Sequence, residues 1–397
     1  MKNNLLYTPE GVRDLYREDC EQKQILERKL SNVSKTYGYR QIQTPSFEYF
    51  DVFNLEYGSR SSRELYKFFD REGNTLVLRP DITPSIARCA TTYFQEEELP
   101  LRFSYIGNTF LNSHSYQGRL RERTQLGAEL IGDDSVDADA EIIALSAKML
   151  QSAGLTRFRI SIGHADILEK LFEATGLDED TIDEMRLLIQ NRNFYGMEQI
   201  VGKLNLEEHL VSLFSMLKTP LADAAELERA AECAASYPQI EASLRRLLLL
   251  DELLGYCGVS RYVSYDPAYV SRMNYYTGIM FAAYTSGSGE AVVNGGRYDR
   301  LLSSFGKDSP ATGFVVIIDQ LLTALNRQKI RIPVSRNRKW ILYDEKNRRA
   351  AFAQAAKLRD NGETVELMPV SDEKPRELYE AYAGRQGISD IMYFCGN

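Results

Sequence analysis

Residues 101–131 read LRFSYIGNTFLNSHSYQGRLRERTQLGAELI and carry the clearest structural signal in the chain. Residues 101–110 and 123–131 are predicted as two strands, since both are largely apolar segments bounded by polar ones. The segment between them, 111–122, is polar and contains glycine, as expected of a hairpin loop. Two long strands joined in this way pair antiparallel, so the stretch predicts an antiparallel sheet.

The flanking sequence adds helices and further strands in a mixed order. Residues 15–37 place apolar side chains at helical spacing and predict an amphipathic helix that ends before Gly38. A helical pattern also covers residues 139–153 and most of 165–256. Strands are predicted at 39–44, 75–79, 157–162, 278–284, 291–293 and 313–318.

These patterns predict an α+β protein with three parts. Residues 1–166 and 257–330 form the main domain, and 167–256 form a helical insertion within it, because this stretch is rich in Leu, Glu and Ala at helical spacing. Pro333 and the basic residues after it indicate a linker. Residues 335–397 then alternate strand and helix patterns and predict a small C-terminal βαβαβ unit.

Composition narrows the class of protein. The chain has 397 residues, 44% hydrophobic and 26% charged, which is typical of folded globular proteins and excludes disorder as the main state. Its formal charge of −8 disfavours binding to a nucleic-acid backbone, which needs a basic face. No apolar run reaches the length of a membrane span and the N-terminus lacks a signal core, so we expect a cytoplasmic protein.

Cysteine and histidine are too sparse to indicate a metal site or a catalytic triad. The five cysteines are scattered singly, without a CxxC pair, and no histidine lies at metal-ligand spacing from them. The three histidines, His114, His164 and His209, are each more typical of surface or core positions than of catalysis. We therefore expect neither a metal nor a cofactor.

Four groups of motifs occur in an order that matches one known family. They are GYRQIQTP at 38–45, LRPDIT at 78–83, YIG, QGR and QLGAE within 105–129, and NYYTG with GGRYD within 274–299. Together they resemble histidyl-tRNA synthetase and its paralogue, the regulatory subunit of ATP phosphoribosyltransferase, over roughly residues 8–325. The resemblance implies a class II aminoacyl-tRNA synthetase-like fold, an antiparallel sheet flanked by helices, which dimerises through the region around Thr44 and Pro45.

Three arginines of the synthetase pattern are missing. Leu111 stands where the synthetase grips the α-phosphate of ATP, Ser271 replaces the arginine that activates histidine, and Gln320 replaces the arginine that stacks on adenine. Ile317 also replaces a glycine that lets the nucleotide approach. A guanidinium binds phosphate bidentately, which none of these residues imitates, and the three losses could cost roughly 5–9 kcal/mol. The resemblance thus implies no adenylate chemistry and no catalytic residue.

The amino-acid pocket of the family is better preserved. Carboxylates suit an ammonium group, and tyrosines can both enclose and hydrogen-bond an imidazole. The alternative is an inherited polar cavity without a ligand. The glycine pair 295–296 is likewise compatible with a tight turn or a phosphate loop, although the resemblance assigns it to the pocket wall. The residues that the resemblance assigns to histidine are Asp81, Thr83, Tyr105, Arg119, Gln125, Glu129, Tyr275 and Tyr276.

The resemblance therefore implies a non-catalytic subunit required by a short-form ATP phosphoribosyltransferase in the first step of histidine biosynthesis. It implies a hetero-oligomer with that catalytic subunit and self-association as a dimer. Any response to histidine would be allosteric, and the sequence leaves open whether this pocket or a site on the catalytic partner binds it. The C-terminal unit, with eleven Lys and Arg against ten Asp and Glu, is short and nearly neutral, a poor docking surface for RNA. Two alternatives stay open: an active, divergent histidyl-tRNA synthetase, and an amino-acid-sensing scaffold for another enzyme.

Overall fold

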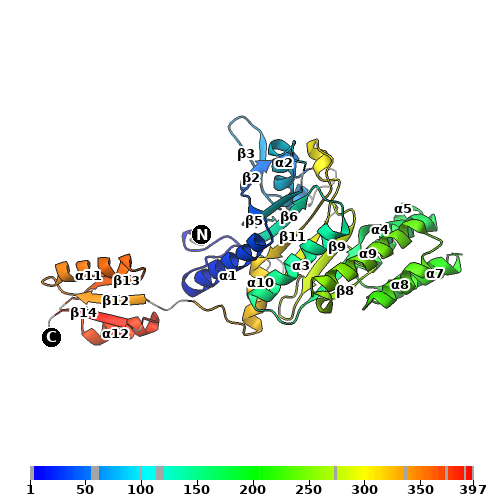
Figure 1. Ribbon diagram of the computed structural model, residues 1–397. Coiled ribbons are helices and arrows are strands. Elements are labelled where there is room, and N and C mark those ends of the chain that lie inside the picture. The colour runs from blue at the N-terminus through cyan, green and yellow to red at the C-terminus, as the bar shows by residue number, and fades with distance from the viewer. Residues whose placement is uncertain are drawn as a thin grey trace. The chain divides into compact units, whose positions relative to one another are not determined.

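A computed structural model shows a chain made of two compact units, residues 1–331 and 332–397, each described here by itself (Figure 1). It describes residues 4–54, 62–98, 100–112, 120–204, 206–271, 275–334, 338–371, 374–388 and 390–395. Within these ranges, no helix combines the length and apolar character needed to cross a bilayer.

The larger unit is built on an eight-stranded sheet in the order β1-β5-β6-β11-β10-β9-β7-β8. Every neighbouring pair from β5 to β7 is antiparallel, whereas the outer pairs β1–β5 and β7–β8 are parallel. The antiparallel sheet predicted from the hairpin is confirmed, and so is the fold class that the resemblance implies, such a sheet with flanking helices. The bounds are β1 Arg40–Gln41, β5 Leu101–Phe110, β6 Glu122–Ile131, β7 Arg159–His164, β8 Val263–Tyr265, β9 Ile279–Tyr284, β10 Val293–Arg297 and β11 Ala311–Ile317.

Helices pack on both faces of this sheet (Figure 1). On one face lie α1 (Arg17–Thr36), α3 (Val136–Ala153) and α10 (Ile318–Arg327), with α1 also against α3. The serine before α3 caps it by accepting the amide hydrogen of Ala138, and Gly154 ends it in the left-handed region. On the other face, α2 (Thr83–Tyr93) packs its apolar side onto the β5–β6 hairpin and leaves the pocket beside its N-terminus.

The segment after β1 corrects the strand predicted at 39–44. Only Arg40 and Gln41 pair with β5. The amide of Ile42 still donates to the carbonyl oxygen of Ser104 at 2.8 Å, and the chain leaves the sheet after it. The guanidinium of Arg79 donates hydrogen bonds to the carbonyl oxygens of Thr44 (2.8 Å) and Pro45 (3.0 Å), which replace the partners that a longer strand would supply. The chain then forms a separate antiparallel sheet, β2-β4-β3, from β2 (Phe47–Tyr49), β3 (Lys67–Phe69) and β4 (Thr75–Leu78).

Between β7 and β8 the chain is helical. Asp178, Asn193 and Asp223 each cap one of these helices with a side-chain oxygen, as their residue types favour. This region belongs to the larger compact unit, and the boundaries expected at 166 and 257 stay predictions. The helices are α4 Ala165–Thr175, α5 Glu179–Gln190, α6 Phe194–Val201, α7 Glu208–Met216, α8 Ala224–Cys233 and α9 Pro238–Tyr256.

The second unit is a three-stranded parallel sheet in the order β13-β12-β14, with helices between consecutive strands. Trp340 on the central strand is buried, and its indole N–H donates to Glu366 at 3.0 Å. The bounds are β12 Arg338–Tyr343, α11 Arg348–Asp360, β13 Thr364–Pro369, α12 Arg376–Arg385 and β14 Asp390–Phe394.

Candidate functional site: a polar pocket on the sheet

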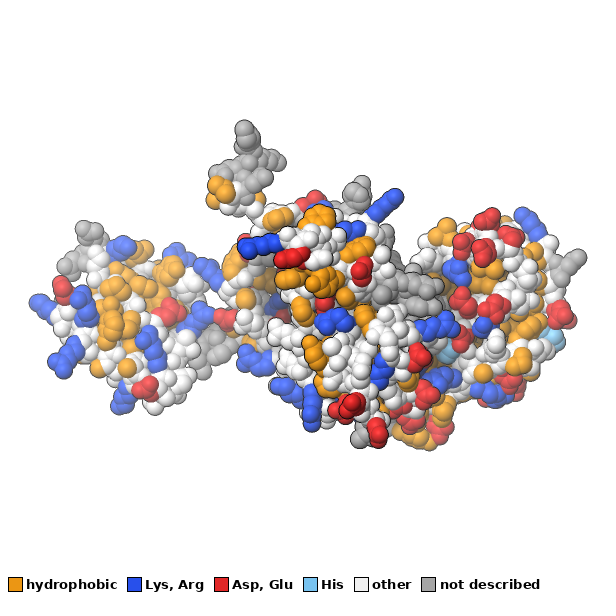
Figure 2. All heavy atoms as spheres, turned by 90° about the horizontal axis from the view of Figure 1, so that it is seen from above, with side chains coloured by type: hydrophobic (Ala, Val, Ile, Leu, Met, Phe, Trp, Pro, Cys, Tyr) orange, Lys and Arg blue, Asp and Glu red, His pale blue; other side chains and the backbone are white. Residues whose placement is uncertain are grey.

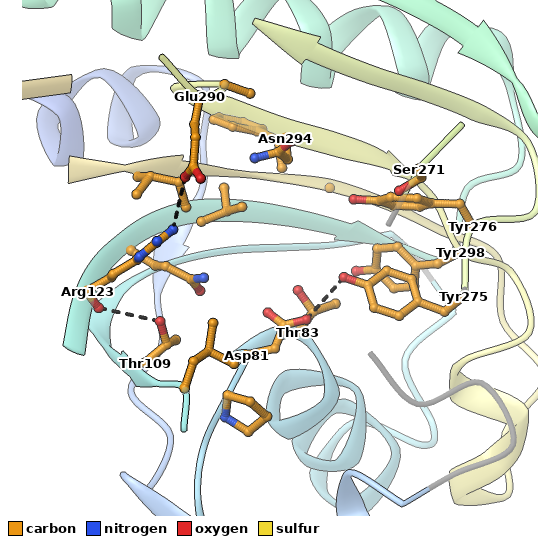
Figure 3. Close-up of a pocket in the computed structure, with 18 of the residues that line it drawn as sticks. Asp81, Thr83, Thr109, Arg123, Ser271, Tyr275, Tyr276, Glu290, Asn294 and Tyr298 are labelled. Carbon is orange, nitrogen blue, oxygen red and sulfur yellow. Dashed lines mark hydrogen bonds and ion pairs between the residues drawn. The ribbon is translucent and has the colours of Figure 1, made fainter. Parts of the chain in front are cut away.

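A pocket of about 370 Å³ opens on the face of the sheet that α2 covers (Figure 3). Its walls come from segments far apart in the sequence: the start of α2, the strands β5, β6, β10 and β11, and the residues before β9. The lining residues used below are Asp81, Thr83, Thr109, Leu111, Arg123, Gln125, Glu129, Ser271, Tyr275, Tyr276, Glu290, Asn294, Tyr298, Gly313 and Ile317.

Glu129 lies at the floor of this pocket and is almost completely buried. Its carboxylate accepts hydrogen bonds from the hydroxyls of Thr83 (2.8 Å) and Tyr298 (2.6 Å). Burial raises the pKa of Glu129 to about 8, and the two hydroxyl donors offset only part of this effect. The floor therefore carries a carboxyl group that is readily protonated when the pocket is empty.

The space for this carboxyl group depends on a glycine in the neighbouring strand. Gly313 on β11 pairs directly with Glu129 on β6. A Cβ at position 313 would lie 1.7 Å from Oε2 of Glu129, much closer than two non-bonded atoms can approach each other. The glycine is thus required for the observed position of the Glu129 side chain.

A second carboxylate, that of Asp81, lines the pocket just before α2 begins. It is buried and accepts hydrogen bonds from the amide of Ile82 (2.8 Å) and from the hydroxyl of Tyr275 (3.1 Å). Its negative charge contributes to the raised pKa of Glu129. Two acidic groups in one pocket favour a ligand that brings positive charge or several hydrogen-bond donors.

Tyrosine rings form the wall next to these carboxyl groups. The ring of Tyr275 meets those of Tyr276 and Tyr298 edge to face, with centroids 5.0 and 5.8 Å apart. Burial holds the pKa of all three hydroxyls well above the ordinary tyrosine value, so they stay neutral. Gly296 leaves room for Tyr276, because a Cβ there would lie 2.8 Å from its ring. The glycine pair 295–296 belongs to strand β10 and packs against the pocket wall; it is not a tight turn.

Gln125 supplies a buried acceptor between the two ends of the pocket. Its Oε1 is shielded from solvent and has no hydrogen-bond partner within the described ranges. A buried amide oxygen without a partner is costly, typically by about 1–3 kcal/mol. A ligand that donates a hydrogen bond at this point would remove that cost.

The structure brings most of the predicted histidine residues together. Asp81, Thr83, Gln125, Glu129, Tyr275 and Tyr276 all line the pocket. Tyr105 lies behind it in the core, where its hydroxyl packs over Gly127 and has no hydrogen-bond partner among the described groups. Arg119 lies outside the described residues.

The pocket also contains residues that the sequence analysis missed, chiefly Tyr298, Arg123, Glu290 and Asn294 (Figure 3). Arg123 had a detectable signal, because it lies two residues before Gln125 and six before Glu129, and alternate strand residues share a face. No sequence signal pointed to Glu290, because this residue follows a Gly-rich turn and lies outside any strand pattern that would place it on a face. Within the described residues, no group of His, Cys, Asp and Glu side chains is arranged to hold a metal ion.

The positions that depart from the synthetase pattern lie in or beside this pocket. Leu111, Ser271 and Ile317 line it. Gln320 on α10 directs its amide toward Glu290, with 3.4 Å between Nε2 and Oε2. The replaced residues are therefore next to the site that the carboxyl groups define.

Comparisons with known proteins agree with this architecture. Residues 11–321 match the family profile described as histidyl-tRNA synthetase. A histidyl-tRNA synthetase structure from Nostoc, 18% identical with a TM-score of 0.79, covers 96% of this chain and 90% of its own, and shows the shared fold. The fold is that of the class II aminoacyl-tRNA synthetases, of the histidyl type.

Curated relatives narrow the assignment. An ATP phosphoribosyltransferase regulatory subunit from Acetivibrio thermocellus is 37% identical and covers 98% of this chain and 93% of its own length. One from Caldanaerobacter subterraneus is 36% identical, covering 91% and 94%. A crystal structure from Bacillus halodurans, titled ATP phosphoribosyltransferase regulatory subunit/histidyl-tRNA synthetase, is 32% identical with a TM-score of 0.87 over 99% of both chains. The chain belongs to the family of ATP phosphoribosyltransferase regulatory subunits.

Proposed function

We propose that this protein is the non-catalytic regulatory subunit required by a short-form ATP phosphoribosyltransferase catalytic subunit, in the first step of histidine biosynthesis. The observation that carries the proposal is that one end of the pocket keeps the residues of an amino-acid site, while the other end lacks the cationic residues of a synthetase. Its amino-acid end keeps Asp81, Thr83, Gln125 and Glu129, while Leu111 and Ser271 stand where a synthetase needs cationic groups.

The loss of the cationic groups bears on catalysis through electrostatics. Transfer of a nucleotidyl group builds negative charge on phosphate oxygens, and cationic or hydrogen-bonding groups must stabilise it. The described lining contains one arginine, Arg123, whose guanidinium is already paired with Glu290 at 3.4 Å. This arrangement supports a chain that does not form an aminoacyl-adenylate.

The chemistry of the floor supports histidine as the regulatory ligand. Asp81 and Glu129 offer carboxyl groups, Gln125 offers an unpartnered oxygen, and Tyr276 an aromatic face. Histidine brings an ammonium group and an imidazole, which match these acceptors. Binding can regulate the partner only if histidine has different affinities for the active and inactive assemblies. The regulation is therefore allosteric.

The exposed face of the β2-β4-β3 sheet supports self-association as a dimer. Phe47 and Phe68 meet edge to face at 5.8 Å between centroids, and both remain accessible, as does Tyr49. This sheet directly follows Thr44 and Pro45, the region that the resemblance assigns to dimerisation. Acidic and basic side chains are interspersed over the face drawn in Figure 2, which supports a protein partner in preference to nucleic acid.

Reconstitution tests the proposal. The purified chain should restore phosphoribosyl transfer when it is mixed with a short-form catalytic subunit, and histidine should inhibit the mixture. The chain alone should show no histidine-dependent pyrophosphate exchange and should not charge tRNA. Failure of reconstitution with a stable, folded chain would overturn the proposal. Pyrophosphate exchange with tRNA charging would instead establish an active synthetase, and co-purification of a different enzyme would establish a scaffold.

A further inference from the structure

An ion pair spans one end of the pocket. Arg123 on β6 and Glu290, in the connection between β9 and β10, lie on facing walls with 3.4 Å between Nη1 and Oε2 (Figure 3). Both side chains are partly shielded, 19% and 31% exposed. Gln320 on α10 approaches the same Glu290 oxygen at 3.4 Å, and Arg123 Nε donates to the carbonyl oxygen of Leu120 at 3.1 Å. Groups from three elements therefore meet at this end.

The pair lies at the opposite end of the pocket from the acidic floor. Arg123, Gln125 and Glu129 lie on one face of the same strand, so the Cα atoms of the first and last are about 20 Å apart at the usual rise per residue. The long side chains of Arg123 and Glu129 occupy part of that length. The volume of about 370 Å³ is also near the lower limit for small-molecule sites.

We propose that the Arg123–Glu290 pair closes this end of the pocket and limits the ligand to the length of a single amino acid. The inference rests on the proposed function, in which the pocket binds histidine. A ligand anchored at Glu129 and extended at its carboxyl end must separate the two side chains, break their ion pair and displace Gln320. Because the two charges neutralise each other, this end also offers little attraction to a free anion.

The consequence is selectivity by length. Free histidine and histidinamide have nearly the same length but differ in the charge of the carboxyl end, whereas the dipeptide histidyl-glycine is longer. The wild-type chain should therefore bind histidine and histidinamide and discriminate against histidyl-glycine. One partly buried ion pair with an added hydrogen bond corresponds to discrimination of about tenfold.

Calorimetric titration of the full chain with the three compounds tests this inference. The variants are Arg123→Ala, Glu290→Ala and the double variant. The control is Arg245→Ala, since Arg245 forms a more exposed ion pair with Glu241 on α9, outside the pocket. Each pocket variant should raise the ratio of histidyl-glycine affinity to histidine affinity by about tenfold. The double variant should raise this affinity ratio no further than the larger of the two single variants, because both single variants break the same ion pair.

Three results would overturn the inference. Equal affinities of the wild type for the dipeptide and for histidine would show that the Arg123–Glu290 pair does not close this end of the pocket. An unchanged ratio in all variants would assign the length limit to other residues. Loss of histidine binding in Arg123→Ala, with weak histidinamide binding by the wild type, would make Arg123 a carboxylate anchor. In these three results the wild type still binds histidine, so they overturn only this inference. If histidine binds neither the wild type nor the variants, the proposed histidine pocket is wrong and the inference that rests on it is wrong as well.

Discussion

The hydroxyl of Tyr298 donates a 2.6 Å hydrogen bond to Oε2 of Glu129, although the two residues are 169 positions apart. Tyr298 follows β10, Glu129 lies on β6, and β11 runs between these strands. The contact is possible because Gly313 on β11 leaves space for the carboxyl group. The floor of the pocket is thus assembled across three strands of the sheet.

Glu129→Gln should weaken histidine inhibition of the reconstituted complex while leaving folding and assembly intact. The amide has nearly the same volume, and the hydroxyls of Thr83 and Tyr298 can still hydrogen-bond it. It cannot ionise against a cationic ligand, however, and the loss of a charge-assisted bond of about 1.5–3 kcal/mol corresponds to about ten- to a hundredfold. The measurement is the histidine inhibition curve, with uninhibited activity as the control.

Unchanged inhibition in a normally assembled Glu129→Gln complex would identify the pocket as an inherited cavity, with histidine sensed on the catalytic partner. Simultaneous loss of assembly would instead identify Glu129 as a structural residue.

The raised pKa of Glu129 should make stability depend on pH in a defined direction. Between pH 4.5, the ordinary pKa of a glutamate, and about 8, the folded chain keeps a proton that the unfolded chain has lost, so the unfolding free energy falls as pH rises. The slope from this group is at most about 1.4 kcal/mol per pH unit. Urea denaturation of wild type and Glu129→Gln, at pH 5.5 and pH 7.5, should show the variant gaining relative stability at the higher pH.

Far-ultraviolet circular dichroism suits this measurement, because the single tryptophan, Trp340, lies in the C-terminal unit and does not report on Glu129. A stability difference that is constant with pH would contradict the raised pKa.

Gly313→Ala should disrupt the floor of the pocket. The added methyl group would overlap Oε2 of Glu129 and approach the carbonyl oxygen of Ala128 to 2.8 Å, so both the side chain and the strand must shift. Overpacking of this kind lowers the unfolding free energy by about 1–3 kcal/mol, and histidine binding should weaken along with it. The matched control is Gly384→Ala on α12, where a methyl group meets no atom within 4 Å. Full histidine affinity in Gly313→Ala would contradict the observed position of Glu129.

Asp139→Asn should destabilise the larger unit more than its conservative size suggests. Asp139 on α3 is buried and accepts hydrogen bonds from Arg297 (3.0 Å) and from Arg246 on α9 (2.8 Å). Burial raises the pKa of Asp139 even beside these guanidinium groups. Among the described residues, loss of its charge leaves the buried Arg297 with Asp299 as its one acidic partner, so we expect a loss of about 3 kcal/mol in unfolding free energy.

Thermal denaturation can compare Asp139→Asn with Glu380→Gln, which removes one charge from an exposed pair with Arg376 in the other unit. The control should change stability by no more than about 1 kcal/mol. Equal changes in stability in the two variants would mean that the negative charge of Asp139 contributes no more to the unfolding free energy than that of an exposed glutamate.

Local pattern alone was sufficient for the regular elements. The β5–β6 hairpin, α1 and the helical region between β7 and β8 follow from apolar spacing and capping residues, which depend on neighbours in the sequence. The pattern failed at 42–44, because the carbonyl oxygens of Thr44 and Pro45 accept hydrogen bonds from Arg79, more than thirty residues away, and not from a neighbouring strand. It also missed β10 beyond Val293, where Gly295 and Gly296 continue the strand because β9 and β11 pair with it on both sides.

By itself, the sequence predicted an antiparallel sheet from strand patterns that depend on neighbouring residues, and its motifs carried the resemblance to the histidyl-tRNA synthetase family. That resemblance implied the fold class and assigned six of the residues that line the pocket. Only the tertiary structure decided which other residues contact these six in the pocket. It brought Tyr298 onto Glu129, placed Glu290 opposite Arg123, and moved Tyr105 behind the pocket. The physical reason is that strand order decides which residues are buried and which pair across a sheet. Strand order places segments next to each other that lie far apart in the sequence, so their contact cannot be predicted from their separation along the chain.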